Sequence, residues 1–538
     1  MIERNLLLVL SMLFVITLLT MLSKRLKISY PIFLVIAGLL ISITPGVPRI
    51  LISPDLVFLI FLPPVLFYAA WNIPWADFWR LRQSISLLGF GLVFFTSTII
   101  AILSQSLIPG FTLALGFLLG GIISPPDAVA ATAVLKDLKI PRKLVSLLEG
   151  ESLVNDASSL VVFRFALLAA VTGTFDLWDA SKDFVMLAGV GILIGLAIGG
   201  VIYLIHRYFP TTAEIDAALT LLAPFVMYLV AEHFHFSGVL SVVAGGLFLS
   251  YHAHRILTYE SRINVAGLWE TLEFLLNGFI FILIGLQMPY IVKNFTENTV
   301  KDALFYGLII SLAVIIIRVV WVYLASMLRI VLKKLTKKET QILSRKEMFL
   351  ISWCGMRGVV SLAMAFSIPF YIRDGVEFPY RNLILFITFV VIIVTLVLQG
   401  LLISPLIKFL KIENLAHDKR MKLEEQLLGI KLAEASLSYI DTNFQNDLAK
   451  SEPFRIVHNR YQHIVNTSKR KVIDKKQGHT EDEDQFVPRY QQMLLELIEV
   501  RRKELVSLRL RGEFDEELLK EKEFELDLEE ARLRVSQS

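Results

Sequence analysis

Charged residues are scarce in most of this chain, and cysteine is almost absent. Of its 538 residues, 19% are Asp, Glu, Lys or Arg, whereas an ordinary soluble domain carries about a quarter. Almost half of these charges lie after residue 411, in less than a quarter of the chain, so the region before it is not composed like a soluble domain. The single cysteine, Cys354, excludes an intramolecular disulfide framework. Its apolar surroundings predict a small core residue.

Apolar runs make up most of the first 411 residues. Runs of about 20 residues recur, which is the length that crosses a hydrocarbon core of about 30 Å. The first run is followed by no small-residue cleavage site, so we interpret it as a span and not as a signal peptide. The pattern predicts an all-α polytopic membrane protein whose 13 spans cover residues 4–23, 29–45, 53–71, 84–107, 112–134, 144–172, 184–208, 214–233, 237–252, 268–291, 302–330, 347–371 and 382–409.

Basic residues occur in alternate loops between these runs. The basic loops carry Lys24, Arg25 and Lys27; Arg80 and Arg82; Lys136, Lys139, Arg142 and Lys143; Arg207; Arg255 and Arg262; and Lys333, Lys334, Lys337 and Lys338. By the positive-inside rule these loops are cytoplasmic. We therefore expect a multi-pass protein of the cell membrane with its N-terminus outside and its C-terminal tail inside, in agreement with an odd number of spans.

Residues 412–538 are polar and form a second predicted domain, separate from the transmembrane domain 1–411. The stretch SKRKVIDKKQGHTEDED, at 468–484, is interpreted as a flexible linker. After it, 490–511 and 514–535 show apolar residues at helical spacing, separated at Gly512. They predict two amphipathic helices that pack on each other or on a partner, either as a solvated hairpin without regulatory function or as a sensor.

Ionisable side chains inside the spans are costly, at roughly 2.5–3.5 kcal/mol each on insertion scales. They mark a function or a compensating pair. They are Asp127, Glu149, Glu151, Asp156, Arg164, Glu232, Glu273, Arg318, Glu347 and Arg357. Glu232 and Glu347 lie near predicted helix ends, which favours an interfacial role, whereas Arg164 could be buried or could extend its charge to the interface.

One polar stripe stands out in the segment EGESLVNDASS. Ser152, Asn155, Asp156 and Ser159 fall at i, i+3, i+4 and i+7, on one face of a helix that is otherwise apolar. Such a face needs a water-filled cavity or a polar partner. Its carboxylate, amide and hydroxyl oxygens are the ligands that hard cations prefer. A polar seam between helices would explain the serines and the amide, but it does not need an aspartate.

Asp156 can bind either a cation or a proton, but not both at once. As a carboxylate it can bind a cation, and burial disfavours the charged form, so a proton competes for the same oxygens. If the protein reorients only when Asp156 is occupied, exchange of the cation for a proton follows.

Two spans are predicted to be interrupted. Pro125 and Pro126 break the fifth span just before Asp127, and Gly355 and Gly358 flank Arg357 in the twelfth. Interrupted spans place helix ends at the midplane of the membrane, where transporters build ion sites. Their separation by seven spans suggests an inverted repeat of six spans with one connector. We expect Arg357 either to offset the half-helix dipoles or to pair with Asp127.

Arg318 lies deep in another apolar run and requires a partner. Glu151, one turn before Asn155, is the partner that we predict. Removal of one member of a buried pair costs about 3–5 kcal/mol.

These motifs, taken together, resemble the monovalent cation/proton antiporters of the NhaP type and the mammalian Na⁺/H⁺ exchangers. The similarity covers residues 20–411 and includes FLPPVLF, SPPDAVAATAV, EGESLVNDASS, WETLEFLLNGFIFILIGL and GMRGVVSLAMA. It is strongest to bacterial Na⁺/H⁺ antiporters with a long cytoplasmic tail. The resemblance implies a 13-helix, NhaA-like inverted-repeat fold with two broken crossing helices, a homodimer, and a core domain that moves against a dimerisation domain.

The resemblance also implies roles for individual residues. It places Na⁺ at Asp156, Ser152 and Asp127, with Asn155 beside them, and it implies electroneutral exchange because Asn precedes Asp. The same resemblance gives Glu151, Arg318 and Arg357 charge-compensating roles and requires no cofactor beyond the transported Na⁺ and H⁺. The chain departs from the pattern in two places. Both prolines precede Asp127, and Tyr68 stands where mammalian exchangers carry an acid.

Four other functions are alternatives to Na⁺/H⁺ exchange. K⁺/H⁺ exchange stays open, because the number of ligands does not show in a sequence. A channel needs no titrating acid, and a membrane-embedded enzyme needs a nucleophile or a metal cluster that the motifs do not provide. A receptor or sensor would need a partner for the tail. We expect the substrates to be Na⁺ (or Li⁺) and H⁺, and we expect no nucleic-acid partner.

Overall fold

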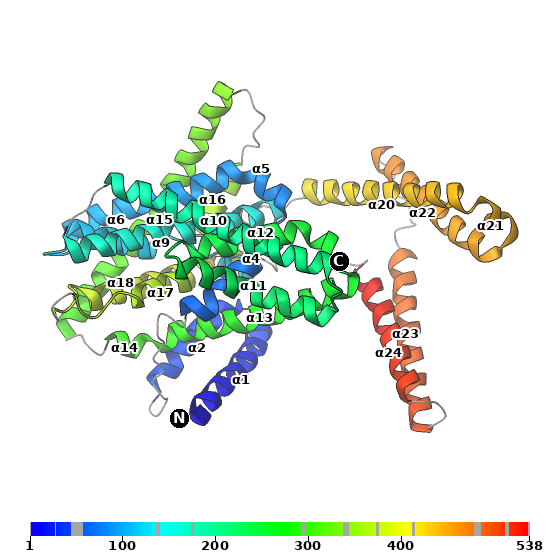
Figure 1. The fold of residues 1–538 in the computed structure, drawn as a ribbon, viewed down its shortest axis with the longest axis horizontal. Helices are drawn as coiled ribbons and strands as arrows, with labels where there is room; N and C mark the ends of the chain where they lie inside the picture. Colours follow the sequence, from blue (N-terminus) through cyan, green and yellow to red (C-terminus); the bar gives the residue numbers. More distant parts are fainter. Residues whose placement is uncertain are drawn as a thin grey trace. The chain divides into compact units, whose positions relative to one another are not determined.

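The computed structural model describes residues 2–26, 28–44, 57–135, 140–173, 177–292, 297–336, 344–372, 376–410, 415–477, 486–511 and 516–535. The chain divides into two compact units, Met1–Asn414 and Leu415–Ser538. Within the described residues every regular element is a helix, apart from one isolated bridge between Tyr371 and Glu377 (Figure 1).

Every predicted span coincides mainly with helix in the first unit; residues 45 and 53–56 lie outside the described ranges. In chain order the elements are α1 (Ile2–Leu26), α2 (Tyr30–Ile43), η1 (Val57–Phe61) with α4 (Leu62–Asn72), α5 (Trp75–Ser86) with η2 (Leu87–Leu92) and α6 (Val93–Leu107), α7 (Leu113–Ile123), α8 (Ala128–Leu135), α9 (Arg142–Thr172), α10 (Leu177–Tyr208), α11 (Ala213–His233), α12 (Gly238–Ile256), α13 (Tyr259–Leu286), α14 (Met288–Val292), α15 (Glu297–Thr336), α16 (Arg345–Trp353), α17 (Val359–Phe366), and α18 (Arg381–Ile393) with η4 (Val394–Gln399) and α19 (Gly400–Leu410). In the part that the structure describes, nine helical stretches are long and apolar enough to cross a membrane. The other predicted spans correspond to α2, η1 with α4, α12, and the pair α16 and α17.

The first unit packs around two separate apolar cores. The larger core draws on α1, α2, α5 to α9 and α13 to α19, and the smaller on α4 and α9 to α13. Helix α9 contributes to both, because Leu148 and Phe163 face the larger core while Leu153 and Ala157 face the smaller. Helix α9 therefore lies at the boundary between the two cores.

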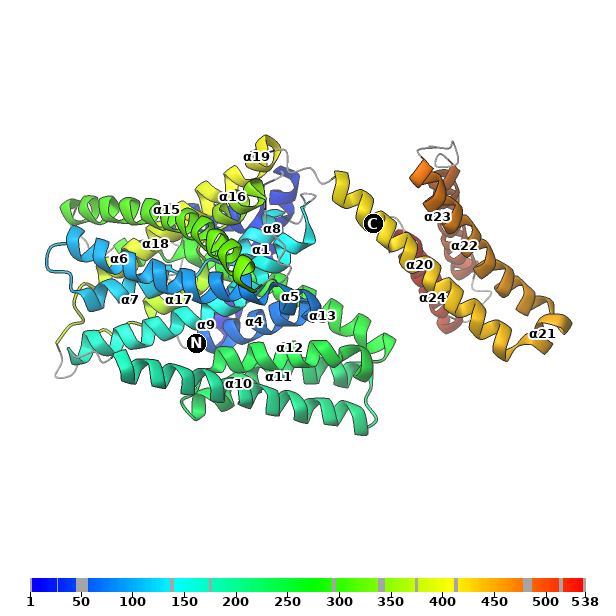
Figure 2. The same cartoon turned by 90° about the horizontal axis from the view of Figure 1, so that it is seen from above.

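Small residues bring α10 and α12 into close contact. Gly191, Gly195 and Gly199 recur every four residues on α10, and a Cβ at Gly195 would overlap the carbonyl of Ser241 on α12. Figure 2 shows α10, α11 and α12 side by side along one edge of the unit. Small residues at this spacing allow helices to associate tightly in membranes.

Wide helical turns interrupt two of the long stretches, at η2 and η4. Such turns leave carbonyls outside the regular hydrogen-bond ladder, and in a membrane these need other donors. The indole N–H of Trp321 donates to the carbonyl of Leu87 at 2.9 Å, and that of Trp353 donates to Gln399 at 3.1 Å. Side chains of neighbouring helices thus satisfy the freed carbonyls.

The second unit begins with a pair of packed helices, α20 (Leu415–Asn443) and α22 (Glu452–Gln477), joined by α21 (Gln445–Lys450). The flexible linker predicted at 468–484 is wrong for 468–477, which continue α22; the rest of that stretch lies outside the described residues. The basic run stays helical because Val465, a turn earlier, packs against α20 and Lys469 pairs with Glu434 at 2.7 Å.

The two helices predicted near the C-terminus are confirmed as α23 (Phe486–Arg511) and α24 (Glu516–Val535). They pack on each other, the first of the two arrangements considered. Arg501 pairs with Glu529 at 2.8 Å, and Arg502 pairs with Glu530 at 2.7 Å. Gly512, the predicted break, falls outside the described residues.

Candidate ion-binding site

Two interrupted helices lie against each other inside the first unit, as predicted. Helix α7 ends at Ile123 and α8 begins at Ala128, while α16 ends at Trp353 and α17 begins at Val359. The N–H of Asp127, in the first interruption, donates to the carbonyl of Met356, in the second, at 2.7 Å. The ends of four short helices therefore meet at one place.

Buried arginines face the carbonyl ends of α7 and α16. Arg357 donates through Nε to the carbonyl of Ile123 at 2.9 Å and also contacts the carbonyls of Ser124 and Gly355. Arg318 donates to the carbonyl of Ile351, in the last turn of α16, at 3.2 Å. The positive charges offset the negative ends of the two half-helix dipoles.

Arg357 therefore follows the first of the two arrangements that the sequence suggested. The expected alternative, an ion pair with Asp127, is wrong: among the described residues the guanidinium contacts backbone carbonyls of α7 and of its own segment. The reason is that the broken helix leaves carbonyls without donors, and these lie closer to Arg357 than any carboxylate of the described residues.

The amino ends of α8 and α17 converge on Asp127. Its Oδ1 accepts from the N–H of Val129 at 2.8 Å, which caps α8. Ser152 accepts from the N–H of Ala128 at 3.4 Å. A Cβ at Gly358, the residue before α17, would overlap the Asp127 carboxylate. The carboxylate thus lies at the positive ends of two half-helices.

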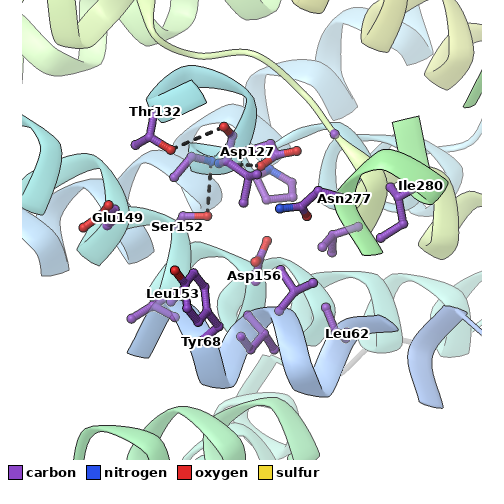
Figure 3. A pocket seen from close by; sticks show the side chains of 18 of the residues that line it. Leu62, Tyr68, Asp127, Thr132, Glu149, Ser152, Leu153, Asp156, Asn277 and Ile280 are labelled. Atoms are coloured by element: carbon purple, nitrogen blue, oxygen red, sulfur yellow. Dashed lines mark hydrogen bonds between the residues drawn. The ribbon is translucent and has the colours of Figure 1, made fainter. Parts of the chain in front are cut away.

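A cavity of about 110 Å³ opens beside these helix ends (Figure 3). It is lined by α4, the first interruption, α8, α9, α13 and α17. Three predicted site residues line it, namely Asp127, Ser152 and Asp156. Asn155 does not line it: this residue is fully buried and donates through Nδ2 to the carbonyl of Pro126 at 3.1 Å. The amide therefore holds the interruption in place.

Asp156 is the most deeply buried of the carboxylates that line the cavity. It is 7% exposed and points into the cavity, toward the side where Asp127 and Asn277 lie (Figure 3). Among the described residues no side chain or backbone N–H donates a hydrogen bond to its carboxylate. A buried carboxylate without donors requires a proton or a cation. Together with Ser152 and Asp127 it offers the oxygen ligands that a hard cation prefers.

The ion pair predicted between Glu151 and Arg318 is present. Two contacts of 2.5 and 2.9 Å join the guanidinium to the carboxylate, and both side chains are 1% exposed. Glu151 does not line the cavity, although Glu149 and Ser152, on either side of it in α9, both do. The pair joins α9, α15 and the end of α16, and so supports the site from behind.

Several cavity residues were absent from the predicted site, namely Tyr68, Asn72, Thr132, Glu149, Glu273, Asn277 and Ser361. Glu149 could have been found, because it lies three and seven residues before Ser152 and Asp156 and extends their stripe by one turn. Glu273 and Asn277 also share a helix face at i and i+4, and Asn277 donates to Glu273 at 3.2 Å. No pattern within one segment shows that α13 faces α9.

Two interrupted membrane helices that meet at a buried carboxylate are the design of a broken-helix ion transporter. The comparison with protein families agrees: the family described as "Sodium/hydrogen exchanger, transmembrane" matches residues 9–409. The chain belongs to this family and resembles antiporters of the NhaP type.

Named relatives support the same assignment. The "Sodium, potassium, lithium and rubidium/H(+) antiporter" of Bacillus pumilus is 36% identical over 408 residues, covering 74% of this chain and 60% of that protein. The "Na(+)/H(+) antiporter ApNhaP" of Aphanothece halophytica is 33% identical, covering 71% and 70%. The match thus spans about 60% of the length of the Bacillus relative. The sodium proton antiporter MjNhaP1 from Methanocaldococcus jannaschii has the same fold, with a TM-score of 0.60 at 20% identity over 75% of this chain and 98% of that one.

Proposed function

We propose that this protein is a secondary active transporter that exchanges Na⁺ or Li⁺ for H⁺ by alternating access. The observation that carries the proposal is Asp156, a buried carboxylate that faces a cavity and receives no hydrogen bond from the described residues. Family membership supports the reaction class, since relatives carry the names of cation/proton antiporters.

The exchange follows from competition for one carboxylate. A cation bound at Asp156 is stabilised by the oxygens of Ser152 and Asp127, whereas a proton neutralises Asp156 without them. The empty, charged state is costly inside the membrane, so the protein reorients only when one of the two ions is bound. Asn155 adds no second charge beside Asp156, which favours one cation per proton and electroneutral exchange.

Alternating access requires one part of the protein to move against another. Helix α9 carries Asp156 and lies at the boundary between the two apolar cores. A shift along this boundary would expose the site to one side at a time. We further propose that the protein crosses the membrane 13 times as two inverted repeats, works as a homodimer in the cell membrane, and has its N-terminus outside.

The second unit, residues 415–538, is then a cytoplasmic helical tail attached to the transport domain. Basic residues of α22 and acidic residues of α24 give its helices charged surfaces. Such surfaces suit both a solvated hairpin and a docking site.

The experiment compares the wild type with Asp156→Asn in everted membrane vesicles. A pH gradient is imposed, Na⁺, Li⁺ and K⁺ are added separately, and collapse of the gradient is recorded. Collapse by Na⁺ in the wild type but not in the variant supports the proposal. Asp302→Asn, which removes an exposed carboxylate on α15, is the matched control and should behave as the wild type. A wild type that responds to no cation would refute antiport.

K⁺/H⁺ exchange is the second candidate function. The Bacillus pumilus relative is named for sodium, potassium, lithium and rubidium, so a wide selectivity among monovalent cations is a specific alternative. The K⁺ response in the same vesicles decides between the two: a K⁺ response as large as that to Na⁺ favours the wide selectivity.

A further inference from the structure

A second cavity lies on the other side of Asp156 along α9. Its volume is about 300 Å³, and it is lined by α9, α10, α11, α12 and Ser367, the residue directly after α17. On α9 the first cavity is lined by residues from Glu149 to Asp156, and the second by residues from Ala157 to Arg164. The two cavities therefore follow successive stretches of one helix, and the change from one to the other falls between Asp156 and Ala157.

One ion pair lies in this second cavity. Among the residues that line it, Arg164 and Glu232 carry charge. Nη2 of Arg164 donates to both carboxylate oxygens of Glu232, at 2.9 and 2.8 Å. Glu232 also accepts from the N–H of Gly238, at the start of α12, at 3.2 Å. The acid is thus fixed at the turn between α11 and α12, whereas the base is carried by α9.

The position of the pair along the helix is informative. Arg164 is eight residues beyond Asp156, which corresponds to about 12 Å along a helix. It lies toward Thr172, the end of α9 opposite to the basic residues Arg142 and Lys143. If that basic end is cytoplasmic, Arg164 and Glu232 lie on the outer side of the site.

We infer that the second cavity is the outer access route to Asp156 and that Glu232 makes this route passable for cations by neutralising Arg164. The inference rests on the proposed function and on the proposed orientation. An unpaired arginine on a cation route repels the substrate, and a partly hydrated route weakens this repulsion without removing it. Arg164 and Glu232 are positioning residues, since they set the field along the route and touch neither the proton nor the bound cation.

The pair also links the boundary helix to the smaller core. Helix α9 carries the site and contributes to both cores, whereas α11 and α12 contribute to the smaller core alone. The side chains of Arg164 and Glu232 are 44% and 29% exposed. Ion pairs exposed to this extent contribute little stability, so this one can break and form again in each transport cycle.

Two single variants and their combination separate an electrostatic role from a structural one. Glu232→Gln leaves Arg164 unpaired and should raise the apparent KM for Na⁺ on the outer side by about two- to tenfold, as expected for one charge at about 12 Å. Arg164→Gln should change the outer KM in the opposite direction. The double variant should return close to the wild type. Lys301→Gln, an exposed basic residue of α15, is the matched control and should have no effect.

The measurement is ²²Na⁺ exchange at varied Na⁺ concentration in right-side-out and in everted vesicles that contain the full-length chain. The expected result is an outer KM that moves in opposite directions in the two single variants, with a smaller change of the inner KM. Equal changes on both sides, or losses in the same direction in both variants, would show a merely structural pair and overturn the inference. Exchange by the wild type tests the proposed function separately.

Discussion

The backbone N–H of Asp127 donates a hydrogen bond of 2.7 Å to the carbonyl of Met356. Donor and acceptor belong to two interrupted helices that are far apart in the sequence. The site carboxylate is therefore held through its main chain as well as by the N–H of Val129. A movement of the second interruption would therefore either break this hydrogen bond or carry Asp127 with it.

The substitution Gly358→Ala should abolish most transport without unfolding the protein. The added Cβ would overlap the carboxylate of Asp127, which then has to leave its position. Displacement of a binding group by about 1 Å can cost up to about 100-fold in rate, so we expect a loss of at least about tenfold in the vesicle assay. Gly267→Ala on α13, where a Cβ meets open space, is the control. Wild-type exchange by Gly358→Ala would mean that the observed position of Asp127 is not required.

Single substitutions in the Glu151–Arg318 pair should destabilise the fold more than a double one. Glu151→Gln leaves Arg318 buried without its counter-charge, at a cost of about 3–5 kcal/mol. Replacement of both residues by apolar side chains of similar size removes the unpaired charge. Thermal unfolding in detergent should therefore give a lower melting temperature for Glu151→Gln than for the double variant Glu151→Leu/Arg318→Met. The opposite order would argue against a supporting role for this pair.

The apparent KM for Na⁺ should rise as the pH falls. A proton and a cation compete for Asp156, so a lower pH leaves fewer carboxylates available to the cation. The limiting slope is about tenfold in KM per pH unit. Initial rates of exchange at several Na⁺ concentrations, with equal pH on both sides, provide the measurement. A maximal rate that changes with pH while the KM stays constant would place the proton elsewhere.

The substitution Gly195→Val should loosen the contact between α10 and α12. A side chain at this position overlaps the carbonyl of Ser241, and overpacking of a tight contact costs about 1–3 kcal/mol. Gly189→Val is the control. It makes the same replacement on the same helix, at a position where a Cβ meets nothing within 4 Å. The melting temperature should fall for Gly195→Val relative to Gly189→Val. Equal melting temperatures for the two variants would show that the contact between α10 and α12 can accommodate a larger side chain.

The parts of the site that lie on one helix could be predicted from the sequence. Helical periodicity places Ser152 and Asp156 on one face, and a charge inside an apolar run requires a partner, which identified Arg318 and Glu151. Pro125 and Pro126 lack backbone donors, so a break before Asp127 follows from covalent structure alone.

Contacts between helices, and contacts with the main chain, could not be predicted in this way. Glu273 reaches the cavity from α13, and no local pattern indicates which helix α13 faces. Arg357 binds carbonyls, which every residue carries and which become available only where a helix is broken. The run 468–477 has the composition of a linker, yet it is helical because Lys469 and the turn before it are held by α20.

Cys354 is the sole cysteine, and it is buried where α16 ends. Thiol reagents should therefore react very little with the folded wild-type protein. A cysteine introduced at an exposed position of α9, such as Leu168, and another at the turn after α11, such as Phe234, would carry the only accessible labels. Spin-label or single-molecule fluorescence distances between two such sites could then follow the opening of the transporter in real time, with no prior removal of native thiols.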